Sequence, residues 1–290
     1  MTILTAYLEG LRTTFRNGKM WLLLYALNFL FALLLAYPFS GFLGEKLSTT
    51  LAIDKLFDGF DYSIFSDILR EYGDVLSVFK NLTIFAVAFY LILSVFIVGG
   101  ILNVFVHHKT STSLSNFWNG ASKYFWRMLR LTFYFLIIHG IVIFIFANIY
   151  GAFTAGGFEN YDSEKYLWQV AYVVVPIYLL VATVFFIAQD YAKIHIVQSD
   201  SNWIFQPILN SFKFVFRNLG KTLLLYLLNL LTFLVFFFIY WKINGHLGPT
   251  SILFAFLLGQ AFIVFRIGTK LLNLGSAVSW FEEKMLTSKT

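Results

Sequence analysis

Three polar residues recur at one fixed distance from an arginine inside otherwise apolar stretches. Asn28, His139 and Asn229 each come twelve residues after an arginine, namely Arg16, Arg127 and Arg217. Each lies about nine residues, roughly 13 Å, into a helical span. If these spans packed around a common axis, the three side chains would form one mid-membrane polar layer on a substrate or proton path. The simpler interpretation is hydrogen bonding between helices, worth about 0.6 kcal/mol on average.

A second pair of polar residues lies near the ends of two other apolar stretches. Asp190 and Arg266 are unlike charges at similar depth, and an unpaired charge inside a membrane is disfavoured. We therefore expect an interhelical ion pair. The alternatives are that Asp190 is the coupling carboxylate of a transporter, or that Arg266 extends to the headgroups by itself.

A repeated unit positions these residues. The stretch 207–237 is reproduced near the N-terminus at an offset of 201. The residues shared with the later copy are Phe15, Arg16, Asn17, Leu22, Leu23, Leu24, Tyr25, Leu27, Asn28 and Leu30. A weaker third copy has Lys123, Trp126 and Arg127 at matching places. The sequence thus predicts three parallel repeats, over about 1–106, 115–191 and 202–272, with a C-terminal amphipathic tail over 273–290.

Composition excludes a soluble protein. Hydrophobic residues make up 59% of the 290 residues, charged residues 12%, and mean hydropathy is +0.75. Six continuous apolar stretches are long enough to cross a bilayer as helices, over 20–42, 81–106, 130–152, 167–191, 220–243 and 250–272. They lack the alternation of barrel strands. We predict an all-α, polytopic membrane protein with six transmembrane helices in a single transmembrane domain.

The distribution of Lys and Arg predicts the orientation. Segments on the side that holds both termini carry 15 basic and five acidic residues, whereas those on the other side carry six basic and ten acidic. Because the basic side of a membrane protein is normally cytoplasmic, both termini are expected in the cytoplasm. An even number of spans requires the same arrangement.

Basic amphipathic helices are expected on that cytoplasmic side, over 1–19, over 115–130 and from Asn202 onward. Such helices lie in the interface with Lys and Arg toward anionic headgroups. The predicted headgroup-binding residues are Arg12, Arg16, Lys123, Arg127, Lys213 and Arg217. Four tryptophans at span ends are expected as interface anchors, namely Trp126, Trp203, Trp241 and Trp280. The expected partners are membrane lipids and a membrane protein, and not nucleic acid.

The stretch FKFVFRNLGKTLLLYLLNLL, residues 212–231, and the pattern [KR]xx[FW]R before a Leu-rich span carry a family resemblance. They resemble uncharacterised bacterial six-span integral membrane proteins built from an amphipathic helix followed by a spanning hairpin. The membrane domain fused to some glycerophosphodiester phosphodiesterases is similar. This chain lacks a soluble phosphodiesterase domain, so no enzymatic role carries over. The resemblance implies a bacterial inner-membrane protein.

Two classes of function remain open. The first is a non-enzymatic scaffold or accessory subunit that binds lipid or partner proteins. It is favoured because the chain has no cysteine and no HExxH, GxGxxG or serine-elbow motif, which also argues against a metal or cofactor. The second is a small transporter or channel that uses the Asn28, His139 and Asn229 layer. A polar cavity reaching His139 would favour transport, and a dry, Phe-filled centre would favour the scaffold.

Overall fold

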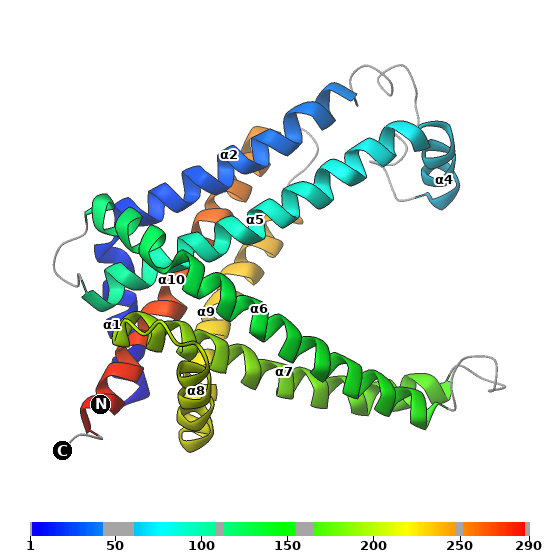
Figure 1. Cartoon of the computed structure of the whole chain (residues 1–290). Helices are drawn as coiled ribbons and strands as arrows, with labels where there is room; N and C mark the ends of the chain where they lie inside the picture. Colours follow the sequence, from blue (N-terminus) through cyan, green and yellow to red (C-terminus); the bar gives the residue numbers. More distant parts are fainter. Residues whose placement is uncertain (1, 43–60, 108–112, 155–164, 247–251, 288–290) are drawn as a thin grey trace. The chain divides into compact units, whose positions relative to one another are not determined.

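The computed structural model describes residues 2–42, 61–107, 113–154, 165–246 and 252–287, and nearly all of these residues are helical (Figure 1). The helices are α1 (Ile3–Arg16), α2 (Gly18–Phe42), α4 (Tyr62–Glu71), α5 (Gly73–His107), α6 (Leu114–Phe153), α7 (Lys165–Ser199), α8 (Phe205–Arg217), α9 (Leu219–Asn244) and α10 (Ile252–Thr287). No strand occurs within these ranges. The predicted all-α class is confirmed.

All six predicted spans are confirmed as helices long and apolar enough to cross a bilayer. They lie in α2, α5, α6, α7, α9 and α10, and their lengths range from 24 to 40 residues. A helix satisfies every backbone polar group within the segment, which a lipid environment requires. The protein is therefore a polytopic helical membrane protein.

An asparagine ends the helix that precedes two of these spans. The backbone N–H of Asn17 donates to the carbonyls of Thr13 and Thr14, and its side-chain amide also donates to the Thr13 carbonyl at 2.7 Å. Asn218 makes the matching side-chain bond to the Phe214 carbonyl at 3.0 Å. The backbone leaves helical geometry at each asparagine, so α1 and α8 end there and a new helix begins.

Burial follows the same offset of 201 residues in α1 and α8. The buried residues of α1 are Ala6, Gly10 and Thr14, and their counterparts Pro207, Ser211 and Val215 are buried in α8. Both helices expose large apolar side chains at matching positions, which are Leu4, Leu8 and Phe15 in α1 and Phe205, Leu209 and Phe216 in α8. Each helix thus packs one narrow face on the protein and presents a broad apolar face outward.

The expected separate helix over 115–130 is wrong. Instead, α6 runs without a break over 40 residues, from Leu114 to Phe153. In the weaker middle copy, Met128 stands where Asn17 and Asn218 stand in the others. Methionine has no side-chain donor to compete for the carbonyls and is a good helix former, so the helix continues.

The C-terminal tail over 273–290 is likewise not a separate element in its described part. Residues 273–287 complete α10. Trp280 is 1% exposed and belongs to the core, so its predicted role as an interface anchor is wrong. Trp126, Trp203 and Trp241 are 68%, 75% and 65% exposed, as anchors would be.

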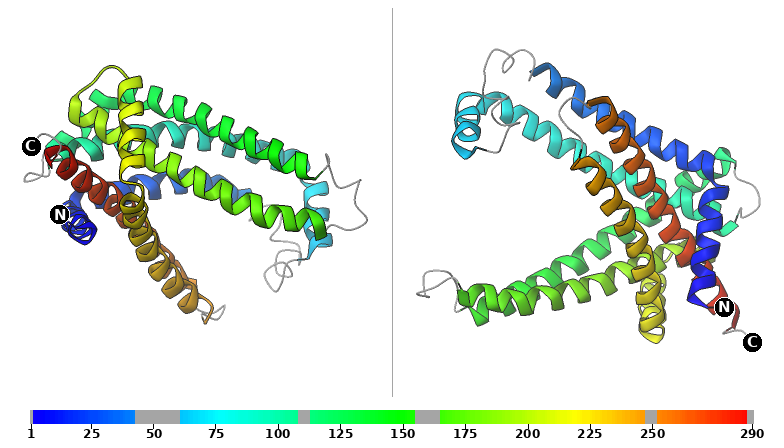
Figure 2. Two further views of the ribbon diagram at one scale, coloured as in Figure 1. Left: turned by 90° about the horizontal axis from the view of Figure 1, so that it is seen from below. Right: turned by 180° about the vertical axis from the view of Figure 1, so that it is seen from behind.

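The chain divides into two compact units, and these do not coincide with the predicted repeats. Unit 2 covers Leu22–Ser94 and is a hairpin of α2 and α5 with α4. Its two long helices run antiparallel, because Phe31 stacks on Phe89 while Phe39 meets Phe79. Unit 1 covers Met1–Trp21 and Val95–Thr290. It contains the hairpins α6/α7 and α9/α10, with α1 against α10 and α8 against α7 (Figure 2).

Small residues let the helices of unit 1 approach closely. A methyl group at Gly10 of α1 would meet the backbone of Ser276 in α10, and one at Gly275 would meet the Gly10 carbonyl. A methyl group at Gly100 of α5 would likewise meet the ring and backbone of Phe117 in α6. Small residues at helix interfaces are typical of membrane proteins, where van der Waals packing drives helix association.

We expect Gly10→Ala to lower the melting temperature of the detergent-purified protein. The added methyl group must push α1 away from α10, and overpacking of this kind costs about 1–3 kcal/mol. Gly259→Ala is the matched control, because no atom lies within 4 Å of a methyl group at that position of α10. Equal melting temperatures for the two variants would contradict the close contact between α1 and α10.

Candidate functional site

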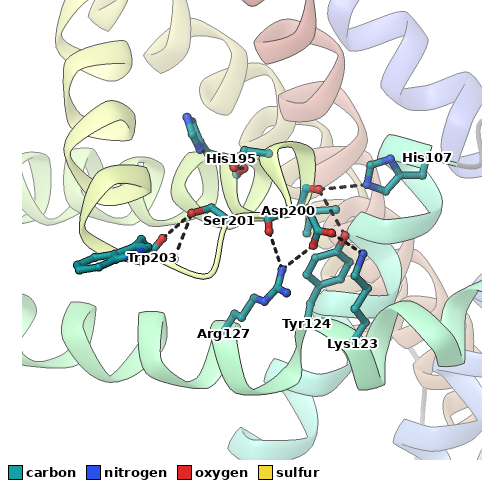
Figure 3. Close-up of polar contacts among 10 residues, drawn as sticks. His107, Lys123, Tyr124, Arg127, His195, Asp200, Ser201 and Trp203 are labelled. Carbon is teal, nitrogen blue, oxygen red and sulfur yellow. Dashed lines mark hydrogen bonds and ion pairs between the residues drawn. The ribbon is translucent and has the colours of Figure 1, made fainter.

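The connection after α7 is held by one acidic residue, Asp200. It follows the last residue of α7 and adopts a left-handed backbone conformation with φ of 49°, which Asp tolerates better than most residues. Its carboxylate accepts hydrogen bonds from Lys123 Nζ at 2.8 Å and from Arg127 Nη1 at 2.6 Å (Figure 3). Arg127 also donates to the Asp200 backbone carbonyl at 3.1 Å.

Neighbouring contacts join three helices at this place. The His107 ring of α5 lies 3.1 Å from the Val197 carbonyl of α7, and the Tyr124 hydroxyl of α6 donates to the same carbonyl at 3.5 Å (Figure 3). The ammonium of Lys123 lies 5.1 Å from the centre of the Tyr124 ring. We call Asp200, Lys123 and Arg127 the Asp200 clamp, because together they fasten the end of α7 to α6.

The clamp explains the charge state of Asp200. Hydrogen bonds from Lys123 first, and then from Arg127, hold the pKa of this carboxyl below its usual value. The sequence predicts both cations as headgroup-binding residues and does not single out Asp200. The headgroup role stays a prediction for the two, but their charge is already partly neutralised within the protein. An acidic residue directly after a span, on the basic side, was the signal available in the sequence.

Asp190 pairs with a residue other than the predicted one. Its carboxylate lies 3.0 Å from Lys193 Nζ on the same helix and accepts a hydrogen bond from the Tyr226 hydroxyl of α9 at 3.1 Å. Both of its oxygens are thus engaged. Arg266 is exposed and makes no ion pair within the described part of the chain. The predicted Asp190–Arg266 pair is therefore corrected to a pair with Lys193.

A partly buried group of polar residues extends from Asp190 to Asn229. Asn273 of α10 lies near the Tyr226 hydroxyl. The amide of Asn229 donates to Asn273 Oδ1 at 2.9 Å and to the hydroxyl of Ser276 at 3.0 Å. Asp190 and Asn229, which the sequence places in separate predictions, therefore have neighbouring partners, Tyr226 and Asn273, that the sequence does not single out.

The other two members of the predicted polar layer have partners close by. Asn28 donates to the Leu24 carbonyl at 2.7 Å and accepts from the Tyr90 hydroxyl at 2.7 Å, both within unit 2. His139 lies 2.7 Å from the Phe135 carbonyl, and its ring centre lies 4.2 Å from that of Phe186. The bond from Tyr90 to Asn28 joins two helices, as the hydrogen-bonding interpretation expects, whereas the bond of His139 lies within α6. A layer shared by all three residues stays a prediction.

The remaining predicted cations lie on α1 and α8. Arg12 is exposed and reaches Glu9, one turn away, only at 3.8 Å, while Arg16 is exposed beside it. Lys213 and Arg217 are also exposed, and they line a cavity of about 440 Å³. That cavity is formed by α7, α8 and α10, and its other polar lining residues are His195, Asn210, Asn218 and Lys284.

We expect Asp200→Asn to loosen the end of α7 at pH 7. The free energy of unfolding should fall by about 1 kcal/mol or less, because the Asp200 side chain is half exposed. Since the pKa of Asp200 is lowered in the folded state, its stabilisation is complete above the unfolded pKa of about 3.9 and is lost as the pH falls through the folded value. Melting temperatures of wild type and variant should thus differ at pH 7 and converge below about pH 4.

The control for this clamp is Glu9→Gln, which removes an exposed contact of 3.8 Å to Arg12. It should leave the melting temperature unchanged at both pH values. A difference between wild type and Asp200→Asn that persisted at low pH would contradict a clamp based on charge.

A double-mutant cycle tests the reassigned partner of Asp190. Asp190→Asn and Tyr226→Phe should show a coupling free energy of about 0.5–3 kcal/mol in unfolding, because each removes the other's hydrogen bond. The cycle of Asp190→Asn with Arg266→Gln should be additive. Coupling to Arg266 without coupling to Tyr226 would restore the original pairing.

The chain was compared with protein-family models, with curated proteins and with solved structures, and none of them matches. The resemblance to six-span bacterial membrane proteins therefore stays an expectation, and the site is interpreted from its own residues.

Proposed function

We propose that this chain is a non-enzymatic membrane scaffold or accessory subunit that binds anionic lipid headgroups, and a partner membrane protein, at the basic end of its helices. The proposal locates the protein in a bacterial inner membrane with both termini in the cytoplasm. It treats α1 and α8, each with the span that follows, as copies of one internal repeat.

One observation carries the proposal, namely that α1 and α8 present the same outward surface. On α1, Leu8 and Phe15 are exposed beside the exposed cations Arg12 and Arg16. On α8, the residues at matching positions are Leu209, Phe216, Lys213 and Arg217, all exposed. Helices of this kind lie in the interface, with apolar side chains among the acyl chains and cations near the phosphates. Each such cation contributes about 1 kcal/mol of attraction to an anionic leaflet.

The asparagine step supports the repeat and the interfacial position of these helices. In both copies the chain passes from a basic helix to an apolar span across a single asparagine. A helix that ended at that residue could lie along the membrane surface while the next helix enters the bilayer. The excess of Lys and Arg on this side supports a cytoplasmic location.

The transport alternative is less well supported. It requires a polar cavity that reaches His139, but the ring contacts of His139 are with Phe135, Phe185 and Phe186. His139 lines neither the cavity of about 440 Å³ in unit 1 nor a second cavity in unit 2, which Phe39, Phe79 and Lys80 help to line. Phenylalanine contacts around His139 favour a scaffold.

Native mass spectrometry of the protein released from nanodiscs tests the proposal. In equimolar phosphatidylglycerol and phosphatidylcholine, the wild type should retain mainly phosphatidylglycerol. Replacing Arg12, Arg16, Lys213 and Arg217 together by Gln should abolish this preference, because the attraction to anionic headgroups is lost.

The control replaces two exposed cations of unit 2, Arg70 and Lys80, by Gln. They belong to the side expected outside the cell, and the lipid preference should survive their loss. If the variant lacking the four cations of α1 and α8 kept the preference for phosphatidylglycerol, the proposed function would be wrong.

A further inference from the structure

The cavity between α7, α8 and α10 differs from the rest of the basic surface because it is hollowed and built from three helices. Its volume of about 440 Å³ lies in the range of roughly 300–1,000 Å³ that small-molecule sites occupy. Lys213 and Arg217 line it from α8, and Lys284 lines it from α10. The neutral groups of His195 and Asn210 complete its polar wall.

The charge of this cavity points to an anion. Lys213 and Arg217 lie four residues apart and so on one side of α8. No residue that lines the cavity is acidic, and neither cation has a carboxylate within 4 Å in the described part of the chain. The clamp cations and Lys193 differ in this respect, because each meets an aspartate. Lys213 and Arg217 therefore repel each other, and a bound anion removes that repulsion.

The hydrogen-bonding groups of the cavity fit phosphate oxygens. Arg217 offers several N–H donors in a planar fork and Lys213 offers a compact ammonium, which are the two side chains most used for phosphate recognition. The amide of Asn210 lies 3.2 Å from His195 Nε2, and His195 Nδ1 lies 3.4 Å from the Ser199 hydroxyl. These bonds hold both side chains in place at the wall, so the polar groups are positioned before a ligand arrives.

The remaining wall is apolar and suits a phosphate that is attached to a lipid. Phe214 and Phe281 line the cavity and pack on each other, with ring centres 4.9 Å apart. Beside them, Tyr191 is fully buried, and its ring centre lies 4.7 Å from that of Phe214. The exposed Phe216 and Leu209 of α8 belong to the surface that the proposed function assigns to the acyl chains.

We infer that this cavity binds one phosphate group per chain, presented by the headgroup of an anionic lipid. The inference rests on the proposed function, since it assumes that α8 lies at the headgroup level. It goes further in assigning a single defined site with residues from three helices, in place of a general attraction to the leaflet.

Arg12 and Arg16 of α1 provide a matched control. They occupy the same places 201 residues earlier in the sequence, but they line neither of the two cavities named above. The full chain is purified in detergent, and dissociation constants for phosphatidylglycerol are measured by native mass spectrometry. Lys213→Gln with Arg217→Gln should weaken binding of the first lipid about 30-fold, as expected for the loss of two headgroup cations. Lys284→Gln alone should weaken it as well, whereas Arg12→Gln with Arg16→Gln should not.

A second arm identifies the source of the phosphate. Inorganic phosphate and glycerol 3-phosphate are added to lipid-free protein, and the melting temperature is recorded. No shift, together with the expected loss of lipid binding, assigns the site to a lipid headgroup. A shift that Lys213→Gln with Arg217→Gln abolishes keeps the phosphate site but overturns the lipid as its source.

Two results overturn the inference, and they are distinguishable. If the double variants on α1 and on α8 weaken binding of the first lipid equally, the cavity is not a distinct site. The proposed function then still holds, because it requires only the combined attraction of the four cations. If wild type binds phosphatidylglycerol no better than phosphatidylcholine, the proposed function fails together with the cavity. Circular dichroism of each variant checks that the helices are intact.

Discussion

The structure depends on a single asparagine at two helix junctions. At Asn17 and Asn218 one helix ends and the next begins, and the side-chain amide of each asparagine donates to a carbonyl of the preceding turn. This separates α1 from α2 and α8 from α9, and it frees the short helices to pack on other elements. Through their small buried residues, α1 packs on α10 and α8 packs on α7. Where Met128 replaces the asparagine, a single helix of 40 residues results.

The distribution of polar contacts follows from the cost of burying charge. Asp190 is partly buried and engages both oxygens, with Lys193 and Tyr226 as partners. Asp200 lies at the surface and still binds two cations, which fasten the end of α7 to α6. Nearby, the amide of Asn229 donates to Asn273 and Ser276. Such bonds hold neighbouring helices in one register where apolar packing alone would allow sliding.

The two asparagine-capped helices show how one sequence pattern acquires two environments. α1 lies against α10 at Gly10 and Gly275, so close that the helices leave no room between them. α8 carries Pro207 and Ile208 at its buried face and lies beside the bulky rings of Tyr191 and Phe281. A cavity lies next to Lys213 and Arg217. The same spacing of cations is thus exposed on α1 and lines a cavity on α8.

The amino-acid sequence alone determined the six spans, because a run of about 20 apolar residues has no stable alternative to a membrane helix. It also indicated the cations of α1 and α8, since that pattern is local and has the helical period, but it did not show that residues 115–130 continue into one long helix. The partners of the polar residues came from the tertiary structure. Tyr226 and Asn273 are far from Asp190 along the chain, and only the packing of α7, α9 and α10 brings them together. Packing likewise buries Trp280, which lies where an interface anchor was expected. Local composition sets the environment that a helix needs, whereas the contacts between helices depend on side-chain shapes that are distant in sequence.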